Sequence, residues 1–385
     1  MIRGICLRKA ESAVFTPETG FELTKPGISP VARVKAPEAV STLTNEELEQ
    51  VLQQAQARIA IVGCGGAGCN TISRMVGVGI QGAETIGLNT DAQDLLYTTA
   101  DRKILIGRDI TGGLGAGNDP ERGEAAARES ESIVKDHIYG TNMVFVTCGL
   151  GGGTGTGAVP VVAEIAKKLG VLTIGVVTLP FTVEGTRRRQ NAEQGLLRLR
   201  GVADTVVVIP NDKLLQLAPD LPIGAAFKVA DQLLMDAIKG ITEMITKPGL
   251  INLDFSDVRA VLQNGGVAML GIGESDTDNR AKEAVEEALT SPLLDVDITG
   301  AKGALVNVVG SLDMTLEEAE QIVSQVSETL DPEAQIIWGA QISEDMKNEV
   351  RVMVVLSGVH SPYALDPGEQ PPRVGGLTDL GLESL

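Results

Sequence analysis

Aromatic residues and histidines are scarce in this chain of 385 residues, where Phe, Trp and Tyr together make up 3% and histidine occurs 2 times. The core must therefore be aliphatic, and a metal site built mainly from histidine is excluded. The 4 cysteines, Cys6, Cys64, Cys69 and Cys148, form no Cys-x-x-Cys pair. They are too few to cross-link a chain of this length, which favours a reducing compartment.

Positive charge and long apolar runs are also scarce. With 32 Lys and Arg against 51 Asp and Glu, the net charge is −19. The longest basic run is Arg187-Arg188-Arg189, so nucleic acid is not expected as a partner. The N-terminus has no signal-peptide core, and apolar stretches such as 170–181 have only the length of strands. We therefore expect a cytoplasmic protein with no direct insertion into a membrane.

The apolar pattern predicts the fold class. Short aliphatic runs at 59–62, 85–88, 103–106, 143–147, 172–177 and 205–209 alternate with stretches of helical period, such as 120–137, 158–169 and 183–199. Such alternation is typical of an α/β fold with a doubly wound, mainly parallel sheet. A long central helix then leads to a smaller α+β domain. The predicted parts are a flexible arm (1–40), a helix (41–57), the α/β domain (58–223), the central helix (224–246), the α+β domain (247–358) and a flexible tail (359–385).

A first glycine-rich loop follows the first predicted strand and opens a helix. It reads Gly63-Cys64-Gly65-Gly66-Ala67-Gly68-Cys69-Asn70, and its candidate phosphate contacts are Gly65, Gly66, Ala67, Gly68, Cys69 and Asn70. Glycines at such a place let backbone N–H groups approach a phosphate at the helix N-terminus. The alternative is a tight strand-to-helix turn with no ligand.

A second glycine-rich loop again joins a strand to a helix. It spans 149–157, and its candidate contacts are Gly151, Gly152, Gly153, Thr154, Gly155, Thr156 and Gly157. Backbone N–H groups and two hydroxyls form a nest suited to a di- or triphosphate. A flexible linker is excluded because aliphatic elements flank the loop closely.

Two other types of nucleotide-binding site fit the sequence less well. A nicotinamide dinucleotide site needs an acidic residue after the second strand, where the chain has Asn89-Thr90-Asp91. Asp91 would serve, but a second glycine nest would then lack a purpose. A Walker site is unlikely because no Gly-Lys-Ser/Thr sequence occurs. The phosphates must therefore be bound mainly by the backbone.

The motif Gly-Gly-Gly-Thr-Gly-Thr-Gly at 151–157 resembles the signature of the tubulin/FtsZ GTPase family. The resemblance covers residues 58 to 358 and suits an archaeal-type member. Further matching motifs follow in the family's order, at 89–91 (NTD), 181–185 (FTVEG), 209–213 (IPNDK) and 249–259 (GLINLDFSDVR). The family implies GTP and GDP as ligands.

The resemblance implies that four polar residues contact the nucleotide. Asn89 and Asp91, in the NTD motif, are further candidates. Glu184 would contact the ribose, and Arg188 the sugar and phosphate; the alternative is a surface ion pair, since they lie four apart. Asn211 and Asp231 would contact the base; the alternatives are a turn residue and a solvated helix face. A carboxylate accepts two N–H donors from guanine but not from adenine.

Asn252, Asp254 and Asp257 cluster in a loop that enters a predicted helix, where Asp254 alone would serve as the N-cap. The resemblance implies instead that this loop completes the active site of a neighbouring subunit, so that the chain is a head-to-tail homopolymer. We assign no side chain as a metal ligand; Mg²⁺ would be held mainly by phosphates, and a monovalent cation remains open.

The predicted function is a cell-division GTPase whose protofilaments form a ring at midcell, with adaptor proteins or a membrane tether bound through the C-terminal tail. A cell-shape filament of the same superfamily is one alternative. An NAD-dependent oxidoreductase is a second, less favoured one.

Overall fold

The computed structural model describes residues 57–217, 222–247, 249–251, 253–294 and 298–359. The predicted arm over 1–40, the predicted helix over 41–57 up to residue 56, the predicted tail from residue 360 onward and Asn252 lie outside the described residues. All the described residues belong to a single structural unit that begins at Ala55.

Six parallel strands form the first part of the sheet, in the order β3-β2-β1-β4-β5-β6. This order confirms the doubly wound parallel sheet. The chain winds outward from β1 in one direction and from β4 in the other, so the switch point lies between these two strands. The strands are β1 (Ile59–Cys64), β2 (Ala83–Asn89), β3 (Arg102–Leu105), β4 (Met143–Gly149), β5 (Leu172–Leu179) and β6 (Thr205–Pro210).

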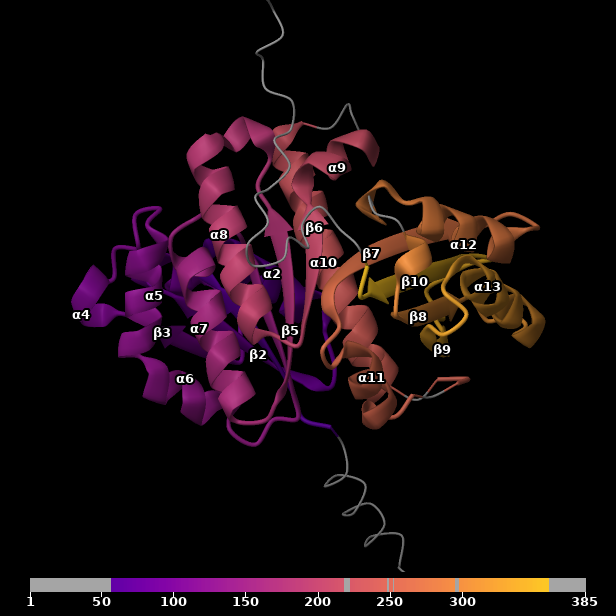
Figure 1. Ribbon diagram of the computed structural model, residues 1–385, viewed down its shortest axis with the longest axis horizontal. Coiled ribbons are helices and arrows are strands. Elements are labelled where there is room, and N and C mark those ends of the chain that lie inside the picture. The colour runs from indigo at the N-terminus through magenta and orange to yellow at the C-terminus, as the bar shows by residue number, and fades with distance from the viewer. Residues whose placement is uncertain (1–56, 218–221, 248, 252, 295–297, 360–385) are drawn as a thin grey trace, which may run out of the picture. The chain divides into compact units, whose positions relative to one another are not determined.

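Helices cover both faces of these strands. Successive side chains of a strand point to opposite faces, so a wholly aliphatic strand has apolar side chains to bury on each face. Ala60 and Val62 belong to the core cluster with α5, α6, α7 and α8, whereas Ile59 and Ile61 belong to the cluster with α2 and the central helix α10 (Figure 1). The helices up to β6 and just after it are α2 (Gly65–Val78), α3 (Ala92–Tyr97), α4 (Arg108–Thr111), α5 (Pro120–Glu129), α6 (Glu131–Ile138), α7 (Thr154–Lys168), η1 (Thr182–Glu184), α8 (Thr186–Val202) and α9 (Asn211–Leu217).

The central helix α10 (Ile223–Thr246) runs along the sheet from one end of the parallel strands to the other. It has 24 residues, which makes it about 36 Å long at about 1.5 Å per residue. Near its start, Phe227 lines a pocket at the carboxyl ends of the strands. At its end, Thr246 packs against Gly82, directly before the first residue of β2. The helix therefore runs from the carboxyl ends of the parallel strands to their amino ends.

The C-terminal part continues the same sheet with four more strands, β7 (Gly266–Ser275), β8 (Gly303–Gly310), β9 (Gln335–Ile342) and β10 (Val350–Ser357), in the order β7-β10-β8-β9. β6 and β7 pair in parallel through three residue pairs, and β10 is antiparallel to both β7 and β8. The remaining helices are α11 (Phe255–Leu262), α12 (Arg280–Thr290), η2 (Pro292–Leu294), η3 (Ile298–Gly300) and α13 (Leu316–Thr329).

One predicted helix is divided in the structure. The stretch 120–137 forms α5 and α6, with a break at Ser130, whose φ and ψ are −102° and 16°. The Ser130 hydroxyl accepts a hydrogen bond from the backbone N–H of Gly107 at 3.2 Å. A polar contact to a distant turn accompanies the break, and helical periodicity does not reveal such a contact.

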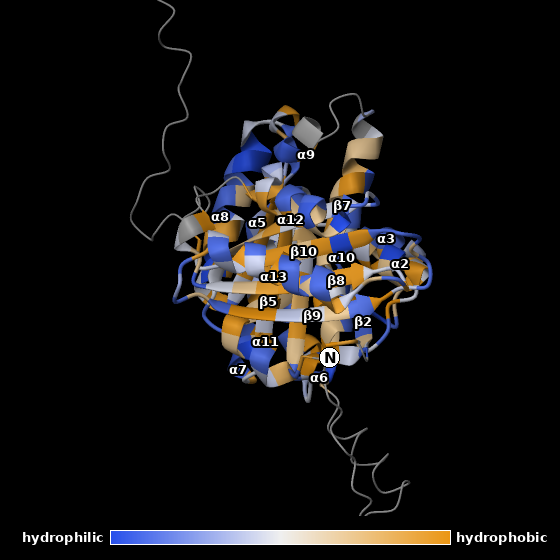
Figure 2. Cartoon of the chain, turned by 90° about the vertical axis from the view of Figure 1, so that its right-hand side faces the viewer, coloured by the Kyte–Doolittle hydropathy of each residue, from blue (hydrophilic) through white to orange (hydrophobic). Residues whose placement is uncertain are grey.

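The described helices show the hydropathy expected of elements that cover a sheet. In Figure 2, α8 and α13 display mainly hydrophilic colours, while hydrophobic colours lie on strands such as β10. Among the described residues, we find no helix with both the length and the apolar character that a membrane span requires.

Candidate nucleotide-binding site

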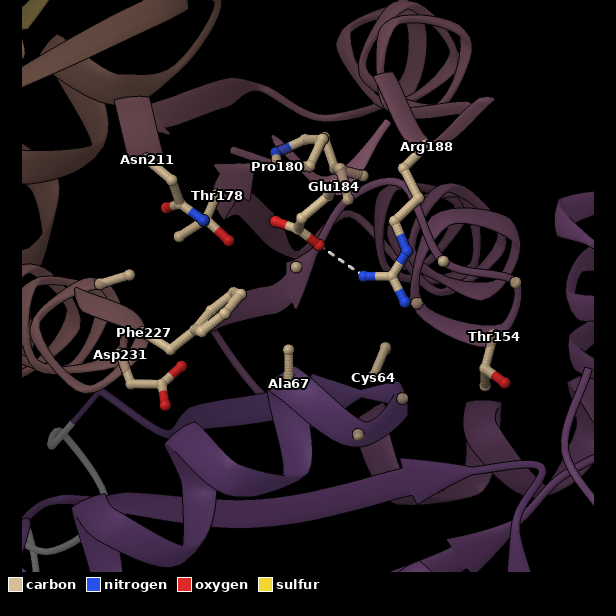
Figure 3. A pocket seen from close by; sticks show the side chains of 18 residues that line it. Cys64, Ala67, Thr154, Thr178, Pro180, Glu184, Arg188, Asn211, Phe227 and Asp231 are labelled. Carbon is tan, nitrogen blue, oxygen red and sulfur yellow. Dashed lines mark hydrogen bonds and ion pairs between the residues drawn. The ribbon is translucent and has the colours of Figure 1, made fainter. Parts of the chain in front are cut away.

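A pocket of about 280 Å³ lies at the carboxyl ends of four neighbouring parallel strands, β1, β4, β5 and β6 (Figure 3). This edge is where doubly wound sheets bind ligands. The predicted contacts on its wall are Gly65, Gly66, Ala67, Gly152, Gly153, Thr154, Gly155, Glu184, Arg188, Asn211 and Asp231. Sequence reasoning missed the rest of the wall, namely Cys64, Gly149, Leu150, Thr178, Pro180, Phe227 and Ala230.

The first glycine loop leaves the N-terminus of α2 open to the pocket. Gly65 has a φ of 70°, and a Cβ there would lie 2.8 Å from the backbone nitrogen of Gly155. Only glycine fits between the two loops at this point. No described side chain caps α2, and its first turn contains no acidic residue. The unpaired N–H groups of the first turn are therefore available to an anion, which the helix dipole also favours.

The second glycine loop opens α7 beside the first. Gly153 precedes α7, and no described side chain caps this helix either. The backbone N–H of Gly151 donates to Thr156 Oγ1 at 2.8 Å, and Thr154 Oγ1 lies 2.5 Å from Thr90 Oγ1. Two helix N-termini thus open onto one pocket, an arrangement that suits a ligand with several negative charges, such as a diphosphate or triphosphate.

Several predicted loop residues shape the loops without lining the pocket. Gly157 lies where α7 meets α5: a Cβ there would be 2.1 Å from the Pro120 carbonyl oxygen. A Cβ on Gly68 would be 2.6 Å from the Thr147 carbonyl oxygen. Asn70 is exposed on α2, outside the pocket wall. Gly157 and Gly68 permit close backbone packing at the loops. Neither they nor Gly151, Thr156 and Asn70 line the cavity.

Cys69 points into the core rather than toward the pocket. Its Sγ lies 3.8 Å from the carbonyl oxygens of both Gly63 and Leu88, and burial raises the pKa of this thiol to about 11. Burial also raises the pKa of Cys148, and that of Cys64, where the two other thiols add to the effect. Thiols that stay protonated are poor nucleophiles, so these side chains act as small core residues.

Asn89 and Asp91 organise the turn between β2 and α3 and do not line the pocket. The Asn89 Oδ1 accepts the N–H of the next residue at 2.8 Å, and Asp91 Oδ1 caps α3 by accepting two backbone N–H groups at 2.9 and 3.1 Å. Asn89 Nδ2 donates to Asp94 at 2.6 Å. Because Asp94 Oδ2 lies 3.3 Å from where a Cβ on Gly66 would stand, this turn borders the first glycine loop.

Glu184 and Arg188 lie on the pocket wall and also pair with each other. Arg188 Nη1 donates to Glu184 Oε2 at 2.5 Å (Figure 3). The other oxygen of Glu184 accepts the backbone N–H of Phe181 at 2.9 Å. The ion pair that was the alternative interpretation is therefore present, and it fixes a carboxylate acceptor and a guanidinium donor at the same pocket. These groups match a sugar hydroxyl and a phosphate oxygen respectively.

Asn211 and Asp231 are polar residues that line another part of the pocket wall (Figure 3). Asn211 is 4% exposed, and its Oδ1 has no hydrogen-bond partner among the described residues. The Asp231 carboxylate lies 3.3 Å from Arg74 of α2. Burial raises the pKa of Asp231, and the Arg74 guanidinium opposes that rise. An unpaired buried oxygen and a shielded carboxylate together offer acceptors to a ligand that carries N–H donors.

Phe227, on the central helix, is a pocket residue that sequence reasoning did not single out. It is 40% exposed, and its ring packs edge-on against Phe181 with centroids 5.0 Å apart. The ring lines the pocket next to Asp231 (Figure 3). An aromatic face at this place can stack on a purine. The available signal was a phenylalanine four residues before a candidate base contact, which places both on one helical face.

Asp254 and Asp257 lie outside the pocket, beyond the end of α10 and at the start of α11 (Figure 1). Both are exposed. Asp254 Oδ1 accepts the backbone N–H of Asp257 at 2.9 Å, so Asp254 is the N-cap of α11. The predicted capping role is present, and neither carboxylate is buried in the core of its own chain.

Comparisons with known proteins agree with this architecture. Residues 58–219 match the GTPase domain of the tubulin/FtsZ family, and residues 266–360 match the C-terminal domain of the FtsZ family. The chain is 62% identical over 331 residues to cell division protein FtsZ 1 of Thermococcus kodakarensis, covering 86% of this chain and 88% of that protein. It is 57% identical over 319 residues to cell division protein FtsZ of Methanothermobacter thermautotrophicus, covering 83% and 84% respectively.

A solved structure shows the same similarity. An empty FtsZ dimer from M. jannaschii matches with a TM-score of 0.79 and 59% sequence identity, over 82% of this chain and 93% of that chain. The glycine loops and the pocket lie in the part of the chain that matches the GTPase domain. The chain therefore belongs to the tubulin/FtsZ family of GTPases.

Proposed function

We propose that this protein is a cell-division GTPase that assembles head-to-tail into protofilaments and hydrolyses GTP where two subunits meet. Two relatives that share 62% and 57% of its aligned residues are named cell division proteins. A related solved structure is described as a dimer, which supports self-association. The match to a GTPase domain favours this function over an NAD-dependent oxidoreductase.

The observation that carries the proposal is the separation of the pocket from the acidic residues. Phe227, near the start of α10, lines the pocket, whereas Asp254 follows the far end of this helix. The helix has 24 residues and is about 36 Å long. General base catalysis needs a group within hydrogen-bond reach of the reacting water. Asp254 therefore acts on nucleotide held by another copy of the chain.

GTP and GDP are the proposed ligands, with one part of the pocket for each part of the nucleotide. The N–H groups of both glycine loops bind the phosphates, and Glu184 and Arg188 bind the sugar and the adjacent phosphate. Asn211 and Asp231 bind the base, and Phe227 stacks on it. The carboxylate of Asp231 selects guanine because guanine presents two N–H donors to it where adenine does not.

Mg²⁺ is proposed to be held mainly by phosphate oxygens and water. The described residues contain no cluster of three or more His, Cys, Asp or Glu side chains arranged to hold a metal ion. The pocket offers the Thr154 hydroxyl, and Asp94 borders the first glycine loop. Such oxygens suit the water shell that Mg²⁺ usually retains. The bound ion supplies charge neutralisation on the phosphates.

Hydrolysis is proposed to proceed by direct attack of water on the γ-phosphate. Asp254 and Asp257 of the adjoining subunit, together with Asn252, orient and polarise that water. An interface whose two halves lie on opposite faces of one molecule repeats from subunit to subunit, so it propagates as a filament. Hydrolysis then depends on assembly. In the cell we expect these filaments in the cytoplasm, in a midcell ring, with adaptor proteins bound to the C-terminal tail.

The test is complementation between two inactive variants. Asp254→Asn keeps the pocket but lacks the catalytic carboxylate. Arg188→Glu keeps the acidic residues but places a carboxylate beside the phosphates. It changes a side chain that is 49% exposed, so we expect the chain to fold, and thermal melting checks this. Each variant alone should hydrolyse little GTP. An equimolar mixture should reach about a quarter of the wild-type rate, because about one contact in four pairs an intact pocket with an intact acidic loop.

The same assay separates the shared site from a site within one chain. Wild-type activity per molecule should rise steeply above a threshold protein concentration. A mixture no more active than the sum of its parts, together with constant activity per molecule on dilution, would show that each chain hydrolyses GTP alone.

A further inference from the structure

A single arginine bridges the helix that opens at the first glycine loop and the helix that carries the base contact. Arg74 lies on α2, and its Nη2 is 3.3 Å from Asp231 Oδ2 on α10. Its Nη1 donates to the backbone carbonyl of Lys228, also on α10, at 3.0 Å. The Arg74 side chain is 34% exposed and that of Asp231 18%. The planar guanidinium uses two of its donors on one helix, which fixes the direction of both groups.

We propose that Arg74 is a positioning residue for guanine selectivity, which acts by holding the Asp231 carboxylate ionised and aimed at the Watson–Crick edge of the base. The inference rests on the proposed function, because it requires that the pocket bind a guanine nucleotide. It adds a residue that does not line the pocket itself and that the motifs of the sequence did not single out.

The charge on Asp231 depends on a balance of two effects. The carboxyl sits beside Ala230 and near Phe227, and burial raises its pKa because desolvation disfavours the anion. Arg74, from α2, is the charged neighbour that lowers it. Across the pocket, Glu184 and Arg188 are paired with each other, and on α10 itself Lys228 is exposed. Loss of Arg74 would leave desolvation unopposed.

Protonation of Asp231 would leave it only one of the two acceptor oxygens that guanine's paired N–H donors need. A protonated carboxyl presents an O–H donor to an edge that also presents N–H donors, at N1 and at the 2-amino group. The anion is present above the pKa and is lost as the pH falls through it. Without Arg74 the pKa is higher, so the loss occurs at a higher pH. Guanine affinity in an Arg74 variant should therefore fall at a pH where the wild-type protein still binds.

The experiment compares GDP with IDP, which lacks the 2-amino group, by calorimetry on the full chain between about pH 5.5 and pH 8.5. Wild-type protein should bind GDP about tenfold more tightly than IDP, since a hydrogen bond to a charged acceptor is lost. In Arg74→Gln this ratio should fall to about threefold or less near neutral pH, and the loss of GDP affinity on acidification should move to higher pH. Arg74→Lys keeps the charge, so its pH profile should stay closer to wild type.

The matched control is Arg102→Gln. It also removes an arginine that pairs with a carboxylate, Glu84, at 3.0 Å, but it lies on β3 and outside the pocket wall. Its ratio and pH profile should equal those of the wild type. Asp231→Asn completes a double-mutant cycle, in which Arg74→Gln should have no further effect on the ratio.

Four outcomes would overturn the inference or the proposed function on which it rests. If Arg74 only fastens α2 to α10, Arg74→Gln will lower the melting temperature and leave both the GDP/IDP ratio and the pH profile unchanged. An equal effect of Arg74→Gln in the Asp231→Asn background would show that it does not act through Asp231. Wild-type protein that binds neither nucleotide would refute the proposed function itself, which is a distinct result. If Arg74→Gln does not fold, the pH profile of GDP affinity of Arg74→Lys decides. An Arg74→Lys pH profile identical to that of Asp231→Asn would also refute the inference.

Discussion

Asparagine and alanine at position 254 separate the capping role of Asp254 from its proposed catalytic role. Asp254 Oδ1 accepts the N–H of Asp257 at 2.9 Å, and alanine abolishes this bond, at a cost of about 1 kcal/mol. Asparagine keeps the cap and loses only the favourable interaction of a charge with the helix N-terminus, about 0.3–1 kcal/mol at low salt. The expected order of stability is therefore wild type, then Asp254→Asn, then Asp254→Ala. Alanine should lower the melting temperature by about 1–2 °C.

Activity should follow a different order. Both variants lack the carboxylate, so both should lose GTPase activity by about a hundredfold or more while retaining GTP binding and assembly. The assay measures phosphate release above the threshold concentration, with sedimentation to confirm assembly and thermal melting to confirm folding. If Asp254→Asn kept most of the wild-type rate, so that activity tracked stability, Asp254 would be a cap and nothing more.

Four further outcomes follow from the packing in and around the pocket. Gly157→Ala should destabilise the fold by about 1–3 kcal/mol in denaturant titrations, since its Cβ would lie 2.1 Å from a backbone oxygen of α5. Gly152→Ala, with nothing within 4 Å of its Cβ, should leave stability unchanged. Phe227→Ala should weaken GDP binding by about 1–3 kcal/mol in calorimetry, the value of one stacked base. Cys64 and Cys148, both buried with raised pKa values, should resist a maleimide until the protein is unfolded, as mass spectrometry would show.

The sequence predicted the elements of the sheet better than the joint between its two parts. Each parallel strand is a continuous aliphatic run because both of its faces are covered, and such runs are visible in one dimension. The pairing of Val206 in β6 with Val267 in β7 is not, since it joins segments separated by α9, α10 and α11. The sequence therefore predicts the smaller α+β domain but not that its strands extend the sheet of the parallel strands.

Glycine-rich motifs and the helical spacing of apolar residues differ in how much of the candidate site they predict. Loop residues such as Gly65 and Gly155 were found because a phosphate nest requires a run of glycines, which is rare by chance. The sequence does not single out Phe227 as a contact, because apolar residues at helical spacing do not reveal which of them border a cavity. Arg74 was missed for a related reason. An arginine on a helix surface looks solvated until the fold brings Asp231 beside it.

The observed capping role of Asp254 is compatible with its proposed catalytic role. The cap engages one oxygen of the carboxylate and thereby restricts the rotation of the side chain, while the second oxygen belongs to a residue that remains exposed. A carboxylate already held by its own helix loses little conformational entropy when it meets a neighbour's nucleotide. Glu184 follows the same logic, since Phe181 and Arg188 fix both of its oxygens beside the pocket. In the proposed shared site, local hydrogen bonds that look purely structural in the single chain would set the geometry with which two chains meet.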